Sequence, residues 1–114
     1  EGVSDEPGAF GGDNSGHFWG ENLEGVRKTP IRLARDPSKL VYSPHAYGPT
    51  LFGHSYFHER SFPANMPSVW QRHFGFVASD FGVPVVIGEM GGQYTKVMHK
   101  AIWLPLLAEE AKSS

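Results

Sequence analysis

The sequence predicts an α/β fold in which a helix connects two parallel strands. A short apolar run over 40–43 and a β-branched run over 85–88 are typical of strands, the second of a strand buried on both faces. Pro44 is expected to end the first strand, because proline cannot donate to a ladder. Between the two runs, from Pro67 to Gly82, apolar residues recur at the spacing of a helix. Strand, helix and strand in this order form a βαβ unit.

The helix is the best-defined element of the sequence. Pro67 suits a first helical position, and Gly82 suits a C-terminal cap. Arg72 and His73 are expected on the flank or on the solvent side. The predicted buried stripe, at positions i, i+4, i+7 and i+11, consists of Trp70, Phe74, Val77 and Phe81.

Long loops occupy much of the remaining chain. We expect loops over 1–25 and over about 45–66, the first rich in glycine and the second in aromatic residues. A last helix is expected over about 95–104, followed by a tail of uncertain structure over 105–114. The 114 residues correspond to a single domain, 1–114.

Composition excludes several classes of function. Hydrophobic residues make up 39% of the chain, too many for a disordered segment. The formal net charge of −2 predicts no nucleic-acid partner and no anionic membrane partner, and no apolar run approaches the roughly 18 residues of a membrane span. Cysteine is absent, which excludes disulfides and thiol-based zinc or redox chemistry.

Polar residues follow both predicted strands. His45 and Tyr47 come after the first, and Glu89 comes after the second with glycines behind it. The carboxyl ends of parallel strands share one edge of a sheet, where functional residues collect. A carboxylate beside an imidazole and a phenol could form a catalytic corner, since a phenol O–H can hold a carboxylate ionised and oriented. The alternative is a glutamate that caps a turn and a histidine that fills loop space.

Four stretches together resemble the cellulase branch of glycoside hydrolase family 5, a (β/α)₈-barrel family of retaining β-glycosidases. The resemblance covers most of residues 1–104 and implies the fifth to seventh β/α segments of a partial TIM barrel, which would not close by itself. The matching stretches are Trp19-Gly20-Glu21-Asn22-Leu23, Val41-Tyr42-Ser43-Pro44-His45-Ala46-Tyr47-Gly48-Pro49, Phe62-Pro63-Ala64-Asn65-Met66-Pro67 with Trp70, Arg72, His73, Phe74 and Gly75, and Val86-Ile87-Gly88-Glu89-Met90-Gly91-Gly92.

The resemblance implies roles for five residues. Glu89 matches the catalytic nucleophile of the family, and Tyr47 matches the tyrosine that contacts it. His45 matches the histidine that lines the site, so His45 and Tyr47 would also contact substrate. Trp19 matches an aromatic that stacks on glucosyl rings, and Asn22 in the same block is expected to bind substrate.

One part of the family's machinery has no match in this chain. The general acid/base of the family is a Glu in an Asn-Glu-Pro segment after the fourth strand, which would precede residue 1. Glu6 and Glu1, in and before the loop after the fifth strand, are the acidic residues that could substitute for it. The Asp-Glu-Pro sequence that contains Glu6 looks similar to that segment but falls after a different strand.

The remaining aromatic and histidine residues have weaker interpretations. His54 and His58 have i, i+4 spacing, but no third ligand is placed to complete a zinc site, so we expect no metal and no cofactor. Aromatic residues of the second loop could form a sugar-binding rim or anchor that loop; they are Tyr56, Phe57 and Phe62. Serine-hydrolase and nucleotide-binding motifs are absent.

The favoured function is therefore endo-acting hydrolysis of cellulose or a related β-glucan by a secreted enzyme, as the resemblance implies. A carbohydrate-binding fragment that lacks the acid is the first alternative. The second is a part that functions only after association with its own copy or with the missing barrel half, since exposed sheet edges favour association.

Overall fold

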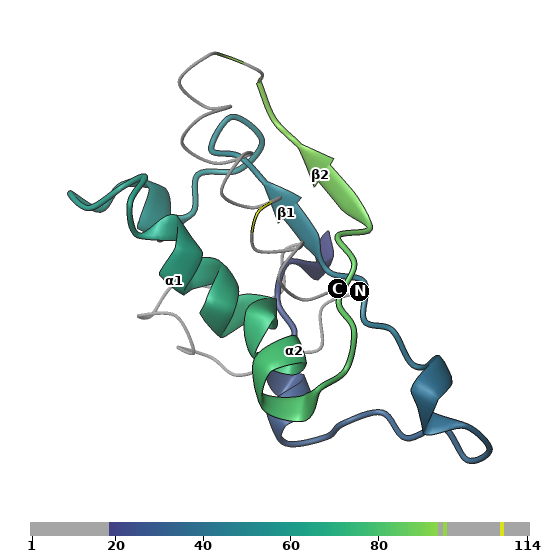
Figure 1. The fold of residues 1–114 in the computed structure, drawn as a ribbon. Helices are drawn as coiled ribbons and strands as arrows, with labels where there is room; N and C mark the ends of the chain where they lie inside the picture. Colours follow the sequence, from purple (N-terminus) through teal and green to yellow (C-terminus); the bar gives the residue numbers. More distant parts are fainter. Residues whose placement is uncertain (1–18, 94, 96–107, 109–114) are drawn as a thin grey trace.

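The computed structural model describes residues 19–93, 95 and 108. Two strands, β1 (His45–Tyr47) and β2 (Glu89–Gly91), run parallel and pair His45 with Glu89 and Tyr47 with Gly91. They lie side by side in Figure 1, with the helical segment packed along them. The parallel βαβ arrangement predicted from the sequence is confirmed, with an open two-stranded sheet in the described part of the chain.

The predicted strand positions are wrong by a few residues. Over 40–43 only Tyr42 pairs, through a bridge to Val85, and the strand itself begins after Pro44. Proline does not stop the strand, because its carbonyl still accepts a hydrogen bond of 2.9 Å from the Gly88 N–H. The expectation for 85–88 fails in the same way, since β2 begins at Glu89 and Val86 is half exposed.

A bulge separates the bridge from the strands. His45 lies three residues after Tyr42, whereas Glu89 lies four residues after Val85, so the second chain segment holds one extra residue. Gly88 occupies this region, where a Cβ would come within 2.2 Å of the Ser43 hydroxyl oxygen. Glycine therefore permits the close approach of the two segments immediately before Glu89.

The helical segment runs from α1 (Met66–Trp70) through a π-helical turn (Gln71–Gly75) into α2 (Phe76–Phe81). Gly82 ends it in the left-handed region at φ 65°, as predicted. Two expectations about its faces are wrong. His73 is buried, because it lies three residues after Trp70 on the same face, and Phe81 is 44% exposed at the last turn.

The core lies between the helical segment and the strands. Its apolar residues include the predicted Trp70, Phe74 and Val77. Tyr56 and Phe57, from the 3₁₀ turn Ser55–Phe57, are also buried, so they anchor their loop and do not form an exposed rim. The other apolar residues of this core cluster are Leu23, Val26, Tyr42, Ala46, Met66, Val69, Phe76 and Val85.

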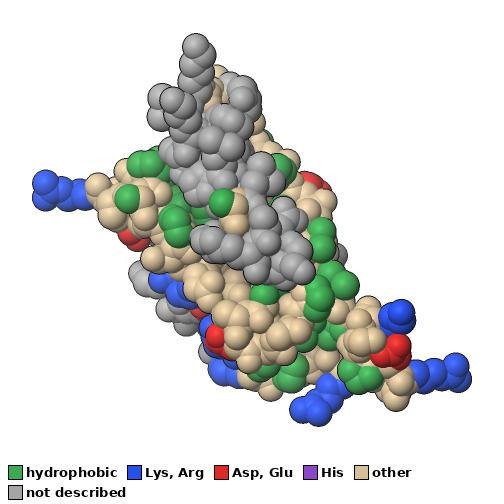
Figure 2. Space-filling model, in the orientation of Figure 1, with side chains coloured by type: hydrophobic (Ala, Val, Ile, Leu, Met, Phe, Trp, Pro, Cys, Tyr) green, Lys and Arg blue, Asp and Glu red, His purple; other side chains and the backbone are tan. Residues whose placement is uncertain are grey.

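The surface in Figure 2 shows hydrophobic side chains exposed among polar ones, while Lys and Arg side chains project from the periphery. Several apolar side chains near the strands are half exposed, among them Val41, Val86 and Met90. Within the described part of the chain, no helix has the length and apolar character that a membrane span requires. The predicted helix over 95–104 and the tail over 105–114 lie outside the described residues, except for Thr95 and Ala108.

Candidate active site

The two strands bring Tyr47 and Glu89 into direct contact. The Tyr47 hydroxyl donates a hydrogen bond to the Glu89 carboxylate across the paired strands. Glu89 itself is exposed to solvent, whereas Tyr47 is buried. An exposed carboxylate with one oxygen held by a buried phenol is oriented and remains accessible to a ligand.

Burial of the phenol, followed by its hydrogen bond to Glu89, raises the pKa of Tyr47 to about 12. The negative charges of Glu89 and Glu21 act in the same direction. Tyr47 is therefore a neutral O–H donor over the whole physiological pH range.

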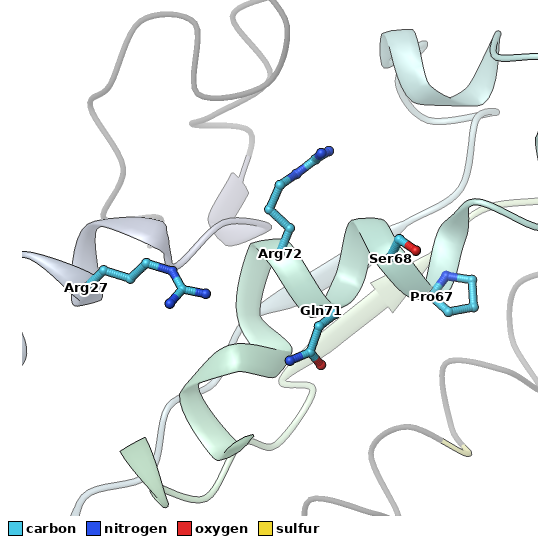
Figure 3. Close-up of a pocket in the computed structure, with 5 residues that line it drawn as sticks. All are labelled: Arg27, Pro67, Ser68, Gln71 and Arg72. Carbon is cyan, nitrogen blue, oxygen red and sulfur yellow. The ribbon is translucent and has the colours of Figure 1, made fainter. Parts of the chain in front are cut away.

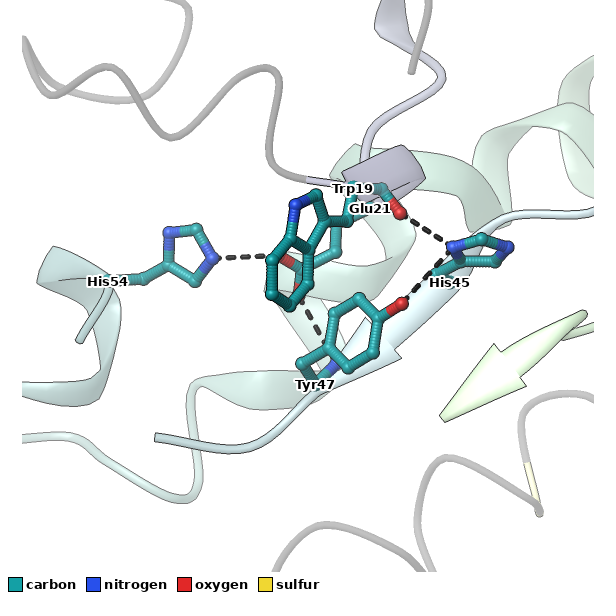
Figure 4. Close-up of polar contacts among 5 residues, drawn as sticks. All are labelled: Trp19, Glu21, His45, Tyr47 and His54. Atoms are coloured by element: carbon teal, nitrogen blue, oxygen red, sulfur yellow. Dashed lines mark hydrogen bonds and ion pairs between the residues drawn. The ribbon is translucent and has the colours of Figure 1, made fainter. Parts of the chain in front are cut away.

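His45 connects this pair to the segment that carries Trp19. Its Nδ1 lies 2.6 Å from the Trp19 carbonyl oxygen and 3.3 Å from the Tyr47 hydroxyl oxygen (Figure 4). A carbonyl only accepts hydrogen bonds, so Nδ1 carries the proton and donates it. This contact fixes both the tautomer and the ring orientation of His45.

The indole of Trp19 lies on the exposed side of this group. Its ring contacts the Tyr47 ring edge to face, with centroids 5.7 Å apart, and 60% of the residue is exposed. Its φ of 39° is left-handed, which is uncommon for a residue other than glycine. A large exposed aromatic face beside an exposed carboxylate is suited to bind the apolar face of a sugar ring.

A second carboxylate, Glu21, lies on the buried side and was not predicted as part of the site. One oxygen of Glu21 accepts the Tyr47 backbone N–H at 3.2 Å, and the other lies 2.8 Å from His54 Nε2 (Figure 4). Both residues are buried. The sequence gives no signal for the contact between Glu21 and His54, because the two residues are 33 positions apart in loops without periodicity.

The other predicted site residues are Asn22, Glu1 and Glu6. Asn22 is fully buried, and its Oδ1 accepts the Glu24 backbone N–H at 2.7 Å, so its expected substrate contact stays a prediction. This buried side chain stabilises the turn Glu24–Arg27. Glu1 and Glu6 lie outside the described residues.

A pocket of about 510 Å³ lies away from these residues, on the solvent side of the helical segment (Figure 3). The Arg27 guanidinium stacks on the Phe76 ring at 3.7 Å and pairs with Asp80 at 3.0 Å. These contacts explain the position of Arg27 without a ligand. The residues that line the pocket are Arg27, Pro67, Ser68, Gln71 and Arg72.

No group of three or more His, Cys, Asp or Glu side chains could hold a metal among the residues that the structure describes. His58 is exposed, and His54 contacts Glu21.

A family profile identifies the wider context of this arrangement. The profile of the family described as cellulase (glycosyl hydrolase family 5) matches residues 8–113. The chain belongs to glycosyl hydrolase family 5. The resemblance seen in the sequence is thereby confirmed, and all described site residues fall within the matched range.

Relatives in this family are endoglucanases. The chain is 42% identical over 94 residues to a major extracellular endoglucanase of Xanthomonas campestris pv. campestris, a match that covers 82% of this chain and 18% of the relative. It is 40% identical over 82 residues to an endoglucanase of Paenibacillus polymyxa, with 72% of this chain and 20% of the relative covered. The chain thus spans about a fifth of the curated relatives it matches.

Solved structures of the family share its fold. The catalytic domain of the major Xanthomonas endoglucanase superimposes with a TM-score of 0.75 at 36% identity, over 99% of this chain and 32% of that one. An endocellulase from Pyrococcus horikoshii in complex with cellotetraose gives a TM-score of 0.67 at 40% identity, over 83% of this chain and 26% of that one. The open sheet and this coverage agree with a partial TIM barrel.

Proposed function

We propose that this chain forms the nucleophile side of an endo-β-1,4-glucanase active site that acts on cellulose or a related β-glucan. The observation that carries the proposal is the exposed Glu89 carboxylate, oriented by the Tyr47 hydroxyl. The cellotetraose complex of the Pyrococcus relative supports a β-1,4-glucan as the ligand class. The name of the Xanthomonas relative supports an extracellular location.

In the proposed mechanism Glu89 attacks the anomeric carbon and the configuration is retained overall. Tyr47 binds Oε1, which leaves Oε2 as the attacking oxygen. The bond to the leaving glycosidic oxygen breaks, that oxygen takes a proton from a carboxylic acid, and a glycosyl ester of Glu89 forms. Water then attacks the anomeric carbon of this ester, the bond from that carbon to Oε2 breaks and frees the Glu89 carboxylate, and the group that protonated the leaving oxygen accepts a proton from the water.

The acid must be a second carboxyl group about 5–5.5 Å from the nucleophile. Glu21 is unsuited, because its carboxylate is buried and both oxygens are bonded. Glu6 and Glu1 are the candidates from this chain that we propose to test, and a carboxyl group from outside it is the other source.

Trp19 and His45 are the proposed substrate contacts. The exposed indole would stack on a glucosyl ring, and the partly buried imidazole contacts the Trp19 carbonyl oxygen and the Tyr47 hydroxyl. Both are linked to Tyr47, so a bound sugar would lie against the same group of side chains that orients the nucleophile.

We further propose that the open sheet associates with additional strands, either from the rest of a barrel or from a second copy. The chain spans 32% of the solved Xanthomonas catalytic domain. Half-exposed Val41, Val86 and Met90 lie in the paired segments and would be covered by such strands. Mass in solution, measured by light scattering, distinguishes a monomer from a self-associated form.

Release of reducing sugar from carboxymethyl-cellulose tests the function, with Glu89→Gln as the matched control. The proposal predicts activity that falls by roughly 10³-fold or more in the control, since an amide is a poor nucleophile. NMR of the first product should show the β-anomer. Sugar binding without turnover in either protein would support the binding-fragment alternative and contradict the proposal.

A further inference from the structure

The buried pair of Glu21 and His54 has no step in the proposed reaction, yet it lies directly behind Tyr47. The two side chains are 4% and 1% exposed, respectively. A carboxylate in such a place is tolerated only where its oxygens are hydrogen-bonded, because burial removes the water that would otherwise solvate its charge. Here His54 Nε2 donates to one oxygen, and the backbone N–H of Tyr47 donates to the other.

The Tyr47 N–H lies on the edge of β1 that β2 does not pair. Pro44 accepts from Gly88 and Gly48 donates to Gly91, so the even-numbered residues of this stretch bond toward β2. Bonding direction alternates along a strand, which places the Tyr47 N–H on the opposite edge. Glu21 therefore satisfies an edge donor at the residue whose side chain orients the nucleophile.

The His54 ring is itself held in place by aromatic packing. It stacks on Tyr56 with a centroid separation of 4.9 Å and an angle of 18°, and it contacts the Phe52 ring at 4.8 Å. Tyr56 belongs to the buried core. A rigid imidazole thus fixes Glu21, which lies two residues after Trp19 and connects that segment to β1.

We propose that Glu21 and His54 form a positioning pair that sets the place of Tyr47 relative to Glu89. The pair acts through the Tyr47 backbone and does not touch substrate. This inference rests on the proposed function, since it assigns the pair to the same site. A misplacement of about 1 Å at a catalytic centre can cost on the order of 10²-fold in rate.

Two substitutions of His54 separate the hydrogen bond from the packing. His54→Phe keeps a ring against Tyr56 and Phe52 but removes the Nε2 donor. His54→Gln loses the ring but keeps an N–H donor that can extend to the same Glu21 oxygen. Each is assayed on 2,4-dinitrophenyl β-cellobioside, per mole of folded protein determined from its unfolding curve, and Glu89→Gln serves as the blank.

The proposal predicts that kcat falls by about 10-fold or more in His54→Phe with KM within about two-fold of wild type, and that His54→Gln keeps most of the wild-type kcat. A purely structural role predicts the opposite order, because the ring contacts would then matter more than the donor. Wild-type kcat in His54→Phe, or a lower kcat in His54→Gln than in His54→Phe, would overturn the proposal.

A measurement on the unsubstituted chain keeps the inference testable if His54→Phe does not fold. Hydrogen exchange by NMR should show the Tyr47 amide protected to the level of the core. Exchange at the rate of an open edge amide would overturn the proposed contact. If the wild-type chain instead equals the Glu89→Gln blank in activity, the proposed function fails, while the exchange result still decides the contact between Glu21 and Tyr47.

Discussion

The side chain of Tyr47 is buried, and its hydroxyl donates a hydrogen bond to the exposed carboxylate of Glu89. Burial and the Glu89 contact favour the neutral phenol, which raises its pKa from about 10 to about 12. A group whose pKa is higher in the folded chain contributes stability that is fully present below its unfolded pKa. That contribution is lost as the pH rises through the folded pKa.

Tyr47→Phe tests this directly. The free energy of unfolding of wild type, measured relative to Tyr47→Phe by urea denaturation, should be constant below about pH 10 and fall between about pH 10 and 12. Other tyrosines and lysines titrate in both proteins, so their effects cancel in the difference. A difference that does not change across this range would show that the phenol of Tyr47 is not perturbed.

Trp19 is expected to contribute more to ligand binding than to stability, because more than half of its surface is exposed. Trp19→Ala should weaken binding of cellotetraose by about 10-fold, while the free energy of unfolding changes by no more than about 0.5 kcal/mol. Calorimetric titration and urea denaturation measure the two quantities. Trp19→Phe, which keeps an aromatic face, should bind with intermediate affinity. A large loss of stability in Trp19→Ala would instead assign the indole to the core.

At the scale of elements, one face of the helical segment carries most of the packing. Met66 is 1% exposed, so Met66→Ala should lower the free energy of unfolding by about 2–5 kcal/mol. Phe81 is 44% exposed, so Phe81→Ala should lower the free energy of unfolding by about 1 kcal/mol or less. Urea denaturation of the two variants measures the difference. Equal effects would contradict the assignment of the buried face.

The helix could be predicted because its signals are local. Proline at the start, apolar residues at helical spacing and Gly82 at the end all act within a few turns. The π-helical turn Gln71–Gly75 has no such signal. His73 is expected at the surface because histidine is polar, but its position on the apolar face of the helix buries it. The predicted strands lie about four residues before the observed ones, because Pro44 interrupts the pattern of the first segment and the bulge between Val85 and Glu89 interrupts that of the second.

Among the candidate site residues, too, those with a local signal in the sequence could be predicted and the others could not. His45, Tyr47 and Glu89 could be found because polar residues next to predicted strands mark the edge of a parallel sheet. Asn22 is expected at the site only because it lies close to Trp19 in the sequence, and its side chain is completely buried in the structure. The contact between Glu21 and His54 joins two aperiodic loops, so only the folded chain reveals it.

At the scale of the whole molecule, the proposed nucleophile Glu89 has no acid assigned to it among the residues that the structure describes. Protonation of the leaving oxygen contributes about 10²–10⁴-fold in rate, but a nitrophenyl leaving group needs little of it. If neither Glu6 nor Glu1 supplies the proton, the chain by itself should therefore hydrolyse nitrophenyl cellobioside faster than cellotetraose by a factor of that order. Both rates can be measured from product release at a fixed substrate concentration.

Two variants extend this comparison to the proposed acids. If Glu6 or Glu1 supplies the proton, Glu6→Gln or Glu1→Gln should slow cellotetraose hydrolysis and leave nitrophenyl cellobioside hydrolysis nearly unchanged. Comparable rates on both substrates that survive in both variants would exclude Glu6 and Glu1 as the acid. They would point to an acid from outside this chain.

Covalent trapping tests the central claim, that Glu89 is the nucleophile, most directly. A 2,4-dinitrophenyl 2-deoxy-2-fluoro-β-cellobioside needs no acid to react, and its fluorine slows hydrolysis of the glycosyl ester. After peptide digestion, mass spectrometry should find one cellobiosyl label on the peptide that contains Glu89 and none on Glu89→Gln. A label on another carboxylate, or equal labelling of Glu89→Gln, would contradict the account.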